Sequence, residues 1–283
     1  MTDLDIGLGY PVSLEDLRFQ ATLLSRVLPN LSVQMRTALS GMYLAVEAMI
    51  PEEARDFDRS LDQNKAVLDL NYYRMLRLTG NLSVAAELQR PAEEPREDRD
   101  IVAEAAQVCR EVESLAELLG LKLCFRCQES RHLCALRPDS VRQLLLQLLS
   151  NAFKFTPAGG EVTVSLEFGG GWVLLRVADT GSGIPEERRA ELFDRYYMTE
   201  QQDPPPYGLG LGLTICRRLA ECHGGRMLAE SQVGKGTHVT VMLPDRQTGH
   251  MALSDRPVDY SGGFNPTLLG LADALPAKAF LEL

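Results

Sequence analysis

Four short segments of the sequence carry residue types that together could bind a phosphorylated nucleotide. An asparagine and a lysine lie within the run Leu148–Thr156, and an aspartate begins the turn Asp179–Pro185. Glycines alternate in the run Gly208–Leu213, and the segment Gly234–Thr237 joins two stretches that alternate like strands. Each segment alone is a common feature of turns or helices. Their occurrence together, in this order, indicates one composite site.

The alternating glycines are suited to binding phosphate. Gly208, Gly210 and Gly212 leave backbone N–H groups free to approach an anion, and the helix that follows presents its positive end to it. A Walker loop requires Gly-Lys-Ser/Thr, whereas Lys235 is followed by Gly236. The alternating run also has the wrong register for a dinucleotide loop. A different type of nucleotide site is therefore expected.

Three side chains could complete that site. Asn151 offers a neutral oxygen to Mg²⁺, which prefers hard oxygen ligands and keeps several waters. Lys154 lies on nearly the same helical face and could contact a phosphate. Asp179, in a tight turn at the end of a strand, could accept a hydrogen bond from an amino group of a base.

This ordered set resembles the ATP-binding domain that sensor histidine kinases share with gyrase, Hsp90 and MutL, over roughly residues 100–245. The resemblance implies ATP and Mg²⁺ as ligands, with Asn151 binding Mg²⁺ and Lys154 contacting phosphate. It also assigns roles around the base and phosphates: Phe155 near the base, Asp179 reading the adenine amino group, Gly181 and Gly183 shaping that pocket, Gly208, Gly210 and Gly212 covering the phosphates, and Thr237 touching the base region. The run Leu192–Tyr197 resembles the kinase-specific phenylalanine box, in a lid that ends near Pro204–Pro206.

Histidine kinases fit best because the N-terminal helices resemble their dimerisation and phosphoacceptor domain. Asn30–Leu39 resembles the kinase box, and Tyr73–Leu78 resembles the second helix of that domain. The phosphoacceptor histidine, however, falls on Val33, and the neighbouring acid falls on Gln34. Valine has no nucleophile, so phosphoryl transfer to this position is chemically impossible.

Other departures affect catalysis. Ser32 and Thr37 carry hydroxyls beside position 33, but neither has an evident base. Gln147 stands where histidine kinases often have asparagine and the related ATPases have a glutamate base. Glutamine can orient a water or a phosphate but cannot accept a proton. Nucleotide binding should tolerate these changes better than turnover, because phosphoryl transfer depends on positioned charge.

Helices and strands alternate in the part of the chain that must position these residues. Periodicity predicts helices at 101–119, 138–155 and 211–223, and strands at 121–127, 161–168, 172–178, 226–231 and 238–243. Gly169–Gly171 reads as a hairpin turn. An antiparallel or mixed sheet beside helices, in this order, predicts a two-layer α+β sandwich.

The first ninety residues predict an antiparallel helical hairpin. Apolar residues recur at alternating spacings of four and three, as in a coiled coil or four-helix bundle: Leu24, Leu28, Leu31, Met35, Ala38, Met42, Ala45 and Met49. Two helices cannot bury such seams alone, so a homodimeric four-helix bundle is expected, with a monomeric hairpin docked on the rest of the chain as the alternative. The expected domains are residues 1–90 (helical), 91–100 (linker), 101–245 (ATP-binding) and 246–283 (tail).

Composition limits the function classes. With 39 Asp and Glu against 29 Lys and Arg, the net charge of -10 disfavours nucleic-acid binding. No apolar run reaches the roughly 18–20 residues of a membrane span, and the acidic N-terminus does not resemble a secretory signal. Cys124 and Cys127 would point to opposite faces of a strand, which disfavours a metal pair. We expect a cytoplasmic protein with buried, reduced thiols.

Four functions remain open at the level of sequence. The first is a signalling protein of two-component systems that binds Mg·ATP but cannot phosphorylate its own bundle. The second is an active kinase that phosphorylates a separate acceptor, such as a response regulator, a phosphotransfer protein or a serine-bearing partner. The third, an ATPase of the gyrase or Hsp90 kind, is disfavoured by Gln147. The fourth is a scaffold that binds no nucleotide. Residues 265–275 predict a short helix in a tail that either packs on the ATP-binding domain or binds a partner.

Overall fold

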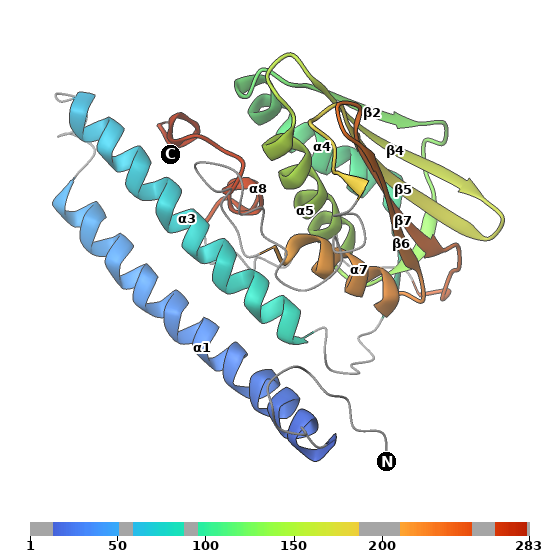
Figure 1. Cartoon of the computed structure of the whole chain (residues 1–283), viewed down its shortest axis with the longest axis horizontal. Coiled ribbons are helices and arrows are strands. Elements are labelled where there is room, and N and C mark those ends of the chain that lie inside the picture. The colour runs from blue at the N-terminus through green and yellow to red at the C-terminus, as the bar shows by residue number, and fades with distance from the viewer. Residues whose placement is uncertain (1–13, 51–58, 88–95, 187–209, 251–263, 282–283) are drawn as a thin grey trace.

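A helical hairpin and a sheet covered by helices on one face make up the molecule (Figure 1). The computed structural model describes residues 14–50, 59–87, 96–186, 210–250 and 264–281. The side chains of residues 14–29 and 87 are not described. The predicted fold class, a helical hairpin followed by a two-layer sandwich, is confirmed.

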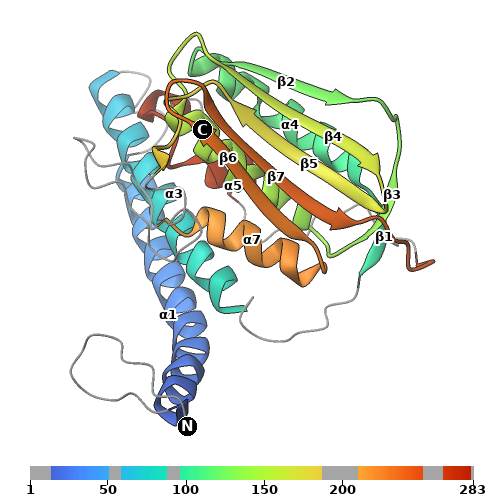
Figure 2. The same cartoon turned by 45° about the vertical axis from the view of Figure 1, so that its right-hand side comes forward.

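The hairpin consists of α1 (Leu14–Met49) and α3 (Arg59–Glu87), which lie side by side in both ribbon views (Figures 1 and 2). The side chains between them and the rest of the molecule are large and apolar: Leu39, Leu70, Tyr72, Tyr73 and Leu76 are buried. A buried lysine adds a polar restraint, because Lys65 Nζ lies 2.5 Å from a carboxylate oxygen of Glu47 on α1 and 2.5 Å from one of Asp69. A buried cation requires such partners, so this cluster holds α1 and α3 in one axial register.

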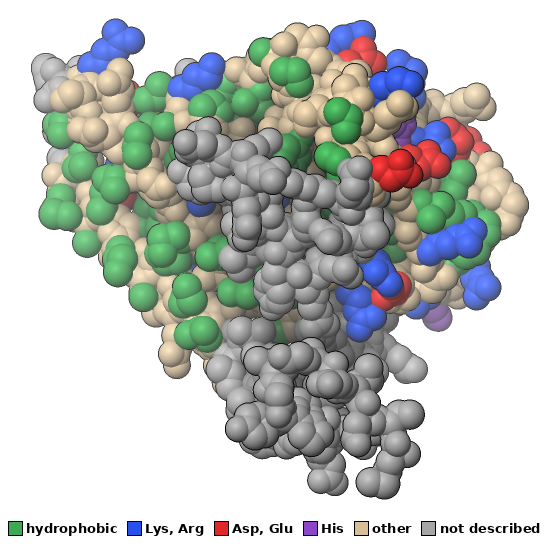
Figure 3. All heavy atoms as spheres, viewed as in Figure 1, with side chains coloured by type: hydrophobic (Ala, Val, Ile, Leu, Met, Phe, Trp, Pro, Cys, Tyr) green, Lys and Arg blue, Asp and Glu red, His purple; other side chains and the backbone are tan. Residues whose placement is uncertain are grey.

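In the described part of the predicted seam of α1, residues 31–49, most side chains are exposed. Met42 and Met49 are 64% and 71% exposed, and Leu31 is also exposed. Leu68 and Met75, seven residues apart on α3, are exposed as well. Figure 3 shows hydrophobic side chains gathered along the hairpin in this way. The hairpin core is therefore built from other positions, and the heptad residues form an outward apolar face.

Five strands form one mixed sheet in the order β2-β4-β5-β7-β6. Their bounds are Lys122–Cys127 for β2, Glu161–Gly169 for β4, Trp172–Asp179 for β5, Arg226–Gln232 for β6 and Gly236–Pro244 for β7. β2 is parallel to β4, and the other neighbouring pairs are antiparallel. The turn at Gly169–Gly171 joins β4 and β5 as predicted.

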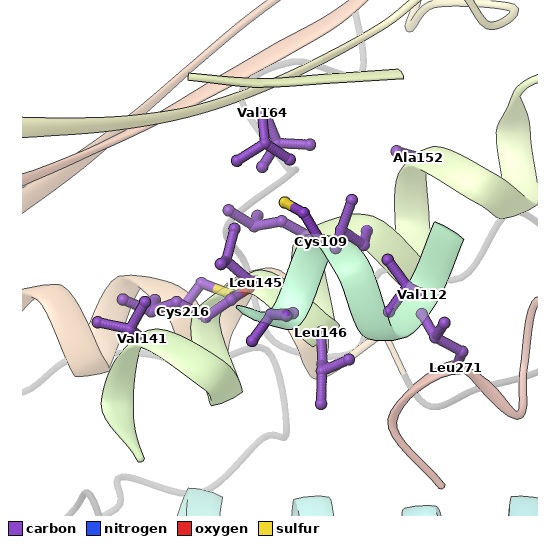
Figure 4. Packing of buried hydrophobic residues seen from close by; sticks show 14 of the residues in the cluster. Cys109, Val112, Val141, Leu145, Leu146, Ala152, Val164, Cys216 and Leu271 are labelled. Atoms are coloured by element: carbon purple, nitrogen blue, oxygen red, sulfur yellow. The ribbon is translucent and has the colours of Figure 1, made fainter. Parts of the chain in front are cut away.

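Helices α4 (Ile101–Leu118), α5 (Ser140–Phe155) and α7 (Gly212–Cys222) cover one face of the sheet (Figure 2). Alternate residues of the central strands point at them and are buried: Val162, Val164, Leu166, Val173, Leu175, Val177, Val239, Val241 and Leu243. Figure 4 shows Val164 of β4 above Cys109 of α4 and Leu145 of α5 in this core. The core thus lies between one face of the sheet and one layer of helices. The apolar face of α5 is packed within it.

A second, two-stranded sheet was not predicted. β1 (Glu97–Asp100) pairs antiparallel with β3 (Leu133–Leu136). The segment 91–100 was interpreted as a linker from its charge. Its last four residues, 97–100, instead form the strand β1. Residues 246–250, predicted as tail, lie beside this small sheet. There the buried Asp98 carboxylate of β1 accepts hydrogen bonds from the backbone N–H groups of Thr248 and Gly249. The segment that precedes α4 and the segment that follows β7 are therefore held together at this sheet.

The C-terminal segment contains α8 (Pro266–Leu271) and a 3₁₀ turn, η1 (Ala277–Phe280). The Asn265 side chain accepts hydrogen bonds from the N–H groups of Thr267 (3.0 Å) and Leu268 (3.1 Å), so it caps α8 as expected. The helix is shorter than predicted, since it ends at Leu271 rather than residue 275.

Asp100 gives a test of this fold. Its carboxylate caps α4 by accepting the N–H groups of Val102 (3.1 Å) and Ala103 (3.2 Å), and it also accepts the N–H of His132 (3.2 Å). Asp100→Ala should lower the free energy of unfolding by about 1–2 kcal/mol, while Asp100→Asn keeps an acceptor and most of the stability. Urea denaturation measures both. Equal midpoints for the alanine variant and the wild type would contradict this role.

Candidate functional site

Helix α5 is the platform of the site because its two faces differ. One face is apolar and buried in the core, with Leu144, Leu145, Leu148 and Ala152. The other carries Gln147, Asn151 and Lys154, whose spacings of four and three residues place them on one side of the helix. The buried face fixes the helix, and the polar face is thereby presented at the edge of the domain.

The start of α7 lies against this polar face. A Cβ built on Gly212 would lie 3.1 Å from Gln147 Oε1 and 3.7 Å from Asn151 Nδ2, so glycine permits a close approach there. Gly210 has a φ of 67°, a left-handed conformation that favours glycine. The predicted asparagine and two of the three predicted glycines are thus brought together. Gly208 and the lid, including Leu192–Tyr197, lie outside the described residues.

The Asp179 turn forms the other end of the site. Asp179 Oδ1 accepts hydrogen bonds from the N–H groups of Gly181 (2.8 Å) and Thr237 (3.2 Å). Among the described residues, both hydrogen bonds given to this carboxylate go to Oδ1, which leaves Oδ2 able to accept from a base amino group. Burial raises the pKa of Asp179, and the two N–H donors oppose that shift. The carboxylate is therefore held in one orientation by the backbone.

The glycines of this turn are required by close backbone approaches. A Cβ on Gly181 would lie 2.5 Å from the carbonyl oxygen of Phe155, and one on Gly183, with φ 68°, would lie 2.0 Å from that of Gln232. The N–H of Ser182 donates to the Phe155 carbonyl at 3.2 Å. The end of α5 and the Asp179 turn are thus joined directly. This contact brings into one continuous region the predicted residues Asn151, Phe155, Asp179, Gly181, Gly183 and Thr237.

Lys154 lies at the interface of α5 with the hairpin and the C-terminal segment. Its Nζ lies 5.5 Å from the centre of the Phe155 ring. The pKa of Lys154 is lowered to about 8, chiefly by burial; the charge of Asp273 opposes this shift, and the positive charges of Arg77 and Arg74 add to it. An ammonium in this environment would be stabilised by an additional anion.

Gln147 is held by α3. Arg77 Nη2 donates to Gln147 Oε1 at 3.0 Å, and Gln147 Nε2 donates to Asn81 Oδ1 at 2.6 Å. Arg77 Nη1 also donates to Ser150 Oγ at 2.7 Å. Sequence reasoning missed Arg77 and Asn81, because they lie 70 and 66 residues before Gln147 in the sequence. Polar residues are frequent along α3, so no local pattern distinguishes these two.

The helical hairpin offers little phosphoacceptor chemistry near position 33. Val33 is 63% exposed. Ser32 is 1% exposed and its hydroxyl has no hydrogen-bond partner among the described residues. The Thr37 hydroxyl donates to the Val33 carbonyl at 3.0 Å, so its proton is directed to the backbone rather than to a base.

A magnesium ion fits this site only as a companion of phosphates. Among the described residues, no three His, Cys, Asp or Glu side chains gather to hold a metal. Asn151 supplies one neutral oxygen donor beside the start of α7. Mg²⁺ commonly binds through one or two protein ligands, substrate phosphates and water, so a single amide is compatible with that mode.

Comparison with known sequences agrees with this geometry. Residues 137–247 match the family described as histidine kinase-, DNA gyrase B-, and HSP90-like ATPase. The adaptive-response sensory kinase SasA of a Synechococcus species is 30% identical over 236 residues, covering 81% of this chain and 61% of that protein. The histidine protein kinase DivJ of Caulobacter vibrioides is 44% identical over 105 residues, covering 37% of this chain and 18% of that protein. The chain therefore spans less than two thirds of the length of these relatives.

A solved structure extends the similarity beyond the ATP-binding domain. The crystal structure of full-length ShkA in complex with AMPPNP has a TM-score of 0.63 and 26% sequence identity. The match covers 82% of this chain and 47% of that one, a share too large to be confined to residues 137–247. No helix within the described ranges is long and apolar enough to cross a membrane.

Lys154 should titrate near pH 8, because burial lowers its pKa to about that value. Since the unfolded chain keeps the proton to about pH 10.4, folding stability should rise as the pH increases through this interval. NMR of isotope-labelled lysine side chains, with Lys154→Arg to assign the signal, measures the titration. Lys122, which is exposed and paired with Glu161, should titrate at higher pH and is the internal control. A Lys154 signal that stays protonated to pH 10 would contradict the described environment.

Proposed function

This chain belongs to the sensor histidine kinase family through its ATP-binding domain, and from that premise we propose that it binds Mg·ATP without phosphorylating its own hairpin. It would act in two-component signalling as a pseudokinase, through nucleotide-dependent shape and partner contacts. The observation that carries the proposal is the joining of Asp179, Asn151 and Gly212 around the end of α5, in a chain whose acceptor position is Val33.

Support for adenine as the base comes from the Asp179 turn. The two backbone donors on Oδ1 fix the carboxylate, so Oδ2 can accept from an exocyclic amino group in a fixed direction. A carboxylate accepts hydrogen bonds and has none to donate when ionised, so it favours a base with an amino group at that place. This favours adenine over a base that carries an oxo group there.

Support for the phosphates and Mg²⁺ comes from the other end of the site. Gly210 and Gly212 bring backbone amides to the start of α7, and the helix adds its positive end. Asn151 would provide an oxygen to Mg²⁺, and Lys154 would contact a phosphate. The ion would neutralise phosphate charge when bound, while the residues of this chain position the nucleotide.

The adenine assignment predicts a change in base preference. In Asp179→Asn the amide oxygen can still accept from Gly181 and Thr237, but its NH₂ group would face the adenine amino group. Loss of that hydrogen bond with a donor left facing a donor costs about 1–3 kcal/mol, or roughly ten- to a hundred-fold in affinity for Mg·ATP. Inosine triphosphate, which carries an oxo group instead, should lose less or gain affinity.

Isothermal titration of the wild type, Asp179→Asn and a matched control, Asp245→Asn, tests this. Asp245 pairs with His132 at 2.8 Å, away from the Asp179 turn, so its replacement should leave nucleotide affinity unchanged. Equal loss of affinity in both variants would argue against base recognition by Asp179. A wild type that does not bind Mg·ATP would refute the proposed function.

The second candidate is an active kinase that phosphorylates a separate acceptor. It is favoured by the retained Asn151, Lys154, Gly210 and Gly212. The hydrogen bonds of Gln147 disfavour this candidate. Gln147 Oε1 accepts from Arg77 and Gln147 Nε2 donates to Asn81, so both polar atoms of the side chain that would orient a water or phosphate are engaged. The acceptor would be a response regulator, a phosphotransfer protein or a serine-bearing partner.

Incubation with γ-labelled ATP separates the two candidates. The wild-type chain should incorporate no label, because Val33 lacks a nucleophile and the Thr37 hydroxyl is committed to a backbone carbonyl. The variant Val33→His with Gln34→Glu, which supplies the missing acceptor and acid, shows whether the hairpin alone prevents transfer. Label on α1 of the wild type would contradict the pseudokinase assignment, and label on an added response regulator would favour the active kinase.

We also propose that the apolar face of the hairpin forms a homodimer, since Met42, Met49, Leu68 and Met75 are exposed there together. Met42→Glu should convert a dimer to a monomer, because a charge would be buried in the interface. Leu44→Glu is the matched control: Leu44 is 68% exposed on the same helix but lies about 200° away. Light scattering coupled to size exclusion measures the mass. A Met42→Glu variant that keeps the wild-type mass would place the interface elsewhere.

A further inference from the structure

The C-terminal segment 264–281 lies between the hairpin and the ATP-binding domain. In both ribbon views α8 and η1 lie beside α3, with α5 on the other side (Figures 1 and 2). The segment therefore contacts both the hairpin and the ATP-binding domain. The relative position of these two parts determines which groups lie close to the polar face of α5.

Aromatic rings attach the segment to the hairpin. The Phe264 ring lies 5.4 Å from Tyr43, 5.1 Å from Tyr72 and 5.7 Å from Tyr73, measured between ring centres. At the other end, the Phe280 ring lies 5.1 Å from Tyr73 and is buried. Such aromatic pairs stabilise packing beyond the area they bury.

A second set of contacts attaches the segment to the domain. A Cβ on Gly270 would lie 2.7 Å from Leu146 Cδ1, so α8 packs closely on α5 at this glycine. Leu271 is fully buried in the same core (Figure 4). Thr267 Oγ1 donates to Glu111 of α4 at 2.9 Å, and Arg142 of α5 donates to the same carboxylate at 2.6 Å. The segment is thus a strap, bound on both sides, and we use that name for residues 264–281.

One acidic residue of the strap lies among cations that border the site. The Asp273 carboxylate lies 3.4 Å from Arg77 Nε, and both side chains are largely buried. Arg74 Nε donates to the Ala272 carbonyl at 3.2 Å. The charge of Asp273 also raises the pKa of Lys154, so the lysine is within its electrostatic reach. Arg77 in turn binds Gln147 and Ser150, beside Asn151.

We propose that the strap is an autoinhibitory element, in which Asp273 occupies the anionic position among Arg74, Arg77 and Lys154 that the triphosphate of Mg·ATP would otherwise fill. This inference rests on the proposed function for the identity of the ligand. While the strap is seated, α3 holds Gln147 and the ATP-binding domain is fixed against the hairpin. When nucleotide binds, its phosphates compete with Asp273 for the same cations and the strap is released.

Competition of this kind is reciprocal. If the strap weakens nucleotide binding by some factor, the nucleotide weakens strap binding by the same factor, and such couplings are commonly about 5–150-fold. A partner that captures the released strap would then raise nucleotide affinity. The chain would in this way couple an external contact to the nucleotide site.

A charge variant of the full chain tests the role of Asp273. Asp273→Asn preserves shape and removes the anion, so the affinity for Mg·ATP should increase about five-fold or more in isothermal titration. The matched control is Lys278→Gln: Lys278 donates to the Leu118 carbonyl at 3.2 Å, in the same strap but away from the cations, and its loss should leave affinity unchanged. Unchanged or weaker binding in Asp273→Asn would overturn the competition.

Release of the strap after folding gives an independent readout. A recognition sequence for a specific protease, inserted between His250 and Phe264, allows the folded chain to be cut, and a synthetic peptide of residues 264–281 can be added back. Cutting should raise Mg·ATP affinity and increase amide exchange in α3 and α5, and the peptide should reverse both. Cutting that lowers the affinity would mean that the strap completes the site.

The readouts separate this inference from the proposed function. If no form binds Mg·ATP, the proposed function is refuted and the competition with it, whereas the exchange data still decide whether the strap holds α3 against α5. If all forms bind equally, the proposed function stands and the autoinhibitory role of the strap is refuted.

Discussion

The polar edge of α5 is the constraint on which the rest of the structure depends. The apolar face of this helix is buried against the sheet, which fixes the rotation of α5 about its axis. The direction of its polar face is fixed as a consequence. Two neighbours meet that face directly, the start of α7 at Gly212 and the Arg77 side chain of α3. The strap is linked to it through the ion pair of Asp273 with Arg77. The proposed site for a magnesium-bound triphosphate therefore lies beside the contacts that hold the two parts of the chain together.

This arrangement fits the proposal that the chain binds ATP without phosphorylating its own hairpin. A site that binds nucleotide needs fixed donors and acceptors, which the Asp179 turn and α7 provide through backbone geometry. Transfer to the hairpin would further need a nucleophile at position 33 and a glutamine, or a base, free to act on the reacting groups. Valine removes the first, and the hydrogen bonds of Gln147 to α3 remove the second. Under the proposed function, nucleotide binding would change contacts rather than move phosphate.

Most of the fold was predictable because its elements have periodic burial. Strands such as β4 and β5 alternate strictly, and α5 carries a continuous apolar face, so their bounds were predicted to within about two residues. β1 and β3 were missed because they are four residues long, and β1 has the sequence Glu-Asp-Arg-Asp, which has no apolar face. The strand conformation of β1 comes from its pairing with β3. The sequence of β1 alone does not indicate that pairing. The site divides in the same way: residues in ordered motifs were found, whereas Arg77, Asn81 and Asp273 act across distances in sequence that no local pattern records.

Hydrogen–deuterium exchange of the full chain, with and without saturating Mg·ATP, tests most directly whether nucleotide and strap share the face of α5. We predict that amides at 151–156, 179–183 and 210–214 become protected while those of 264–281 become less protected, in the same titration. Protection at the site with no change in the strap would contradict the shared face, and no change anywhere would contradict the nucleotide site itself.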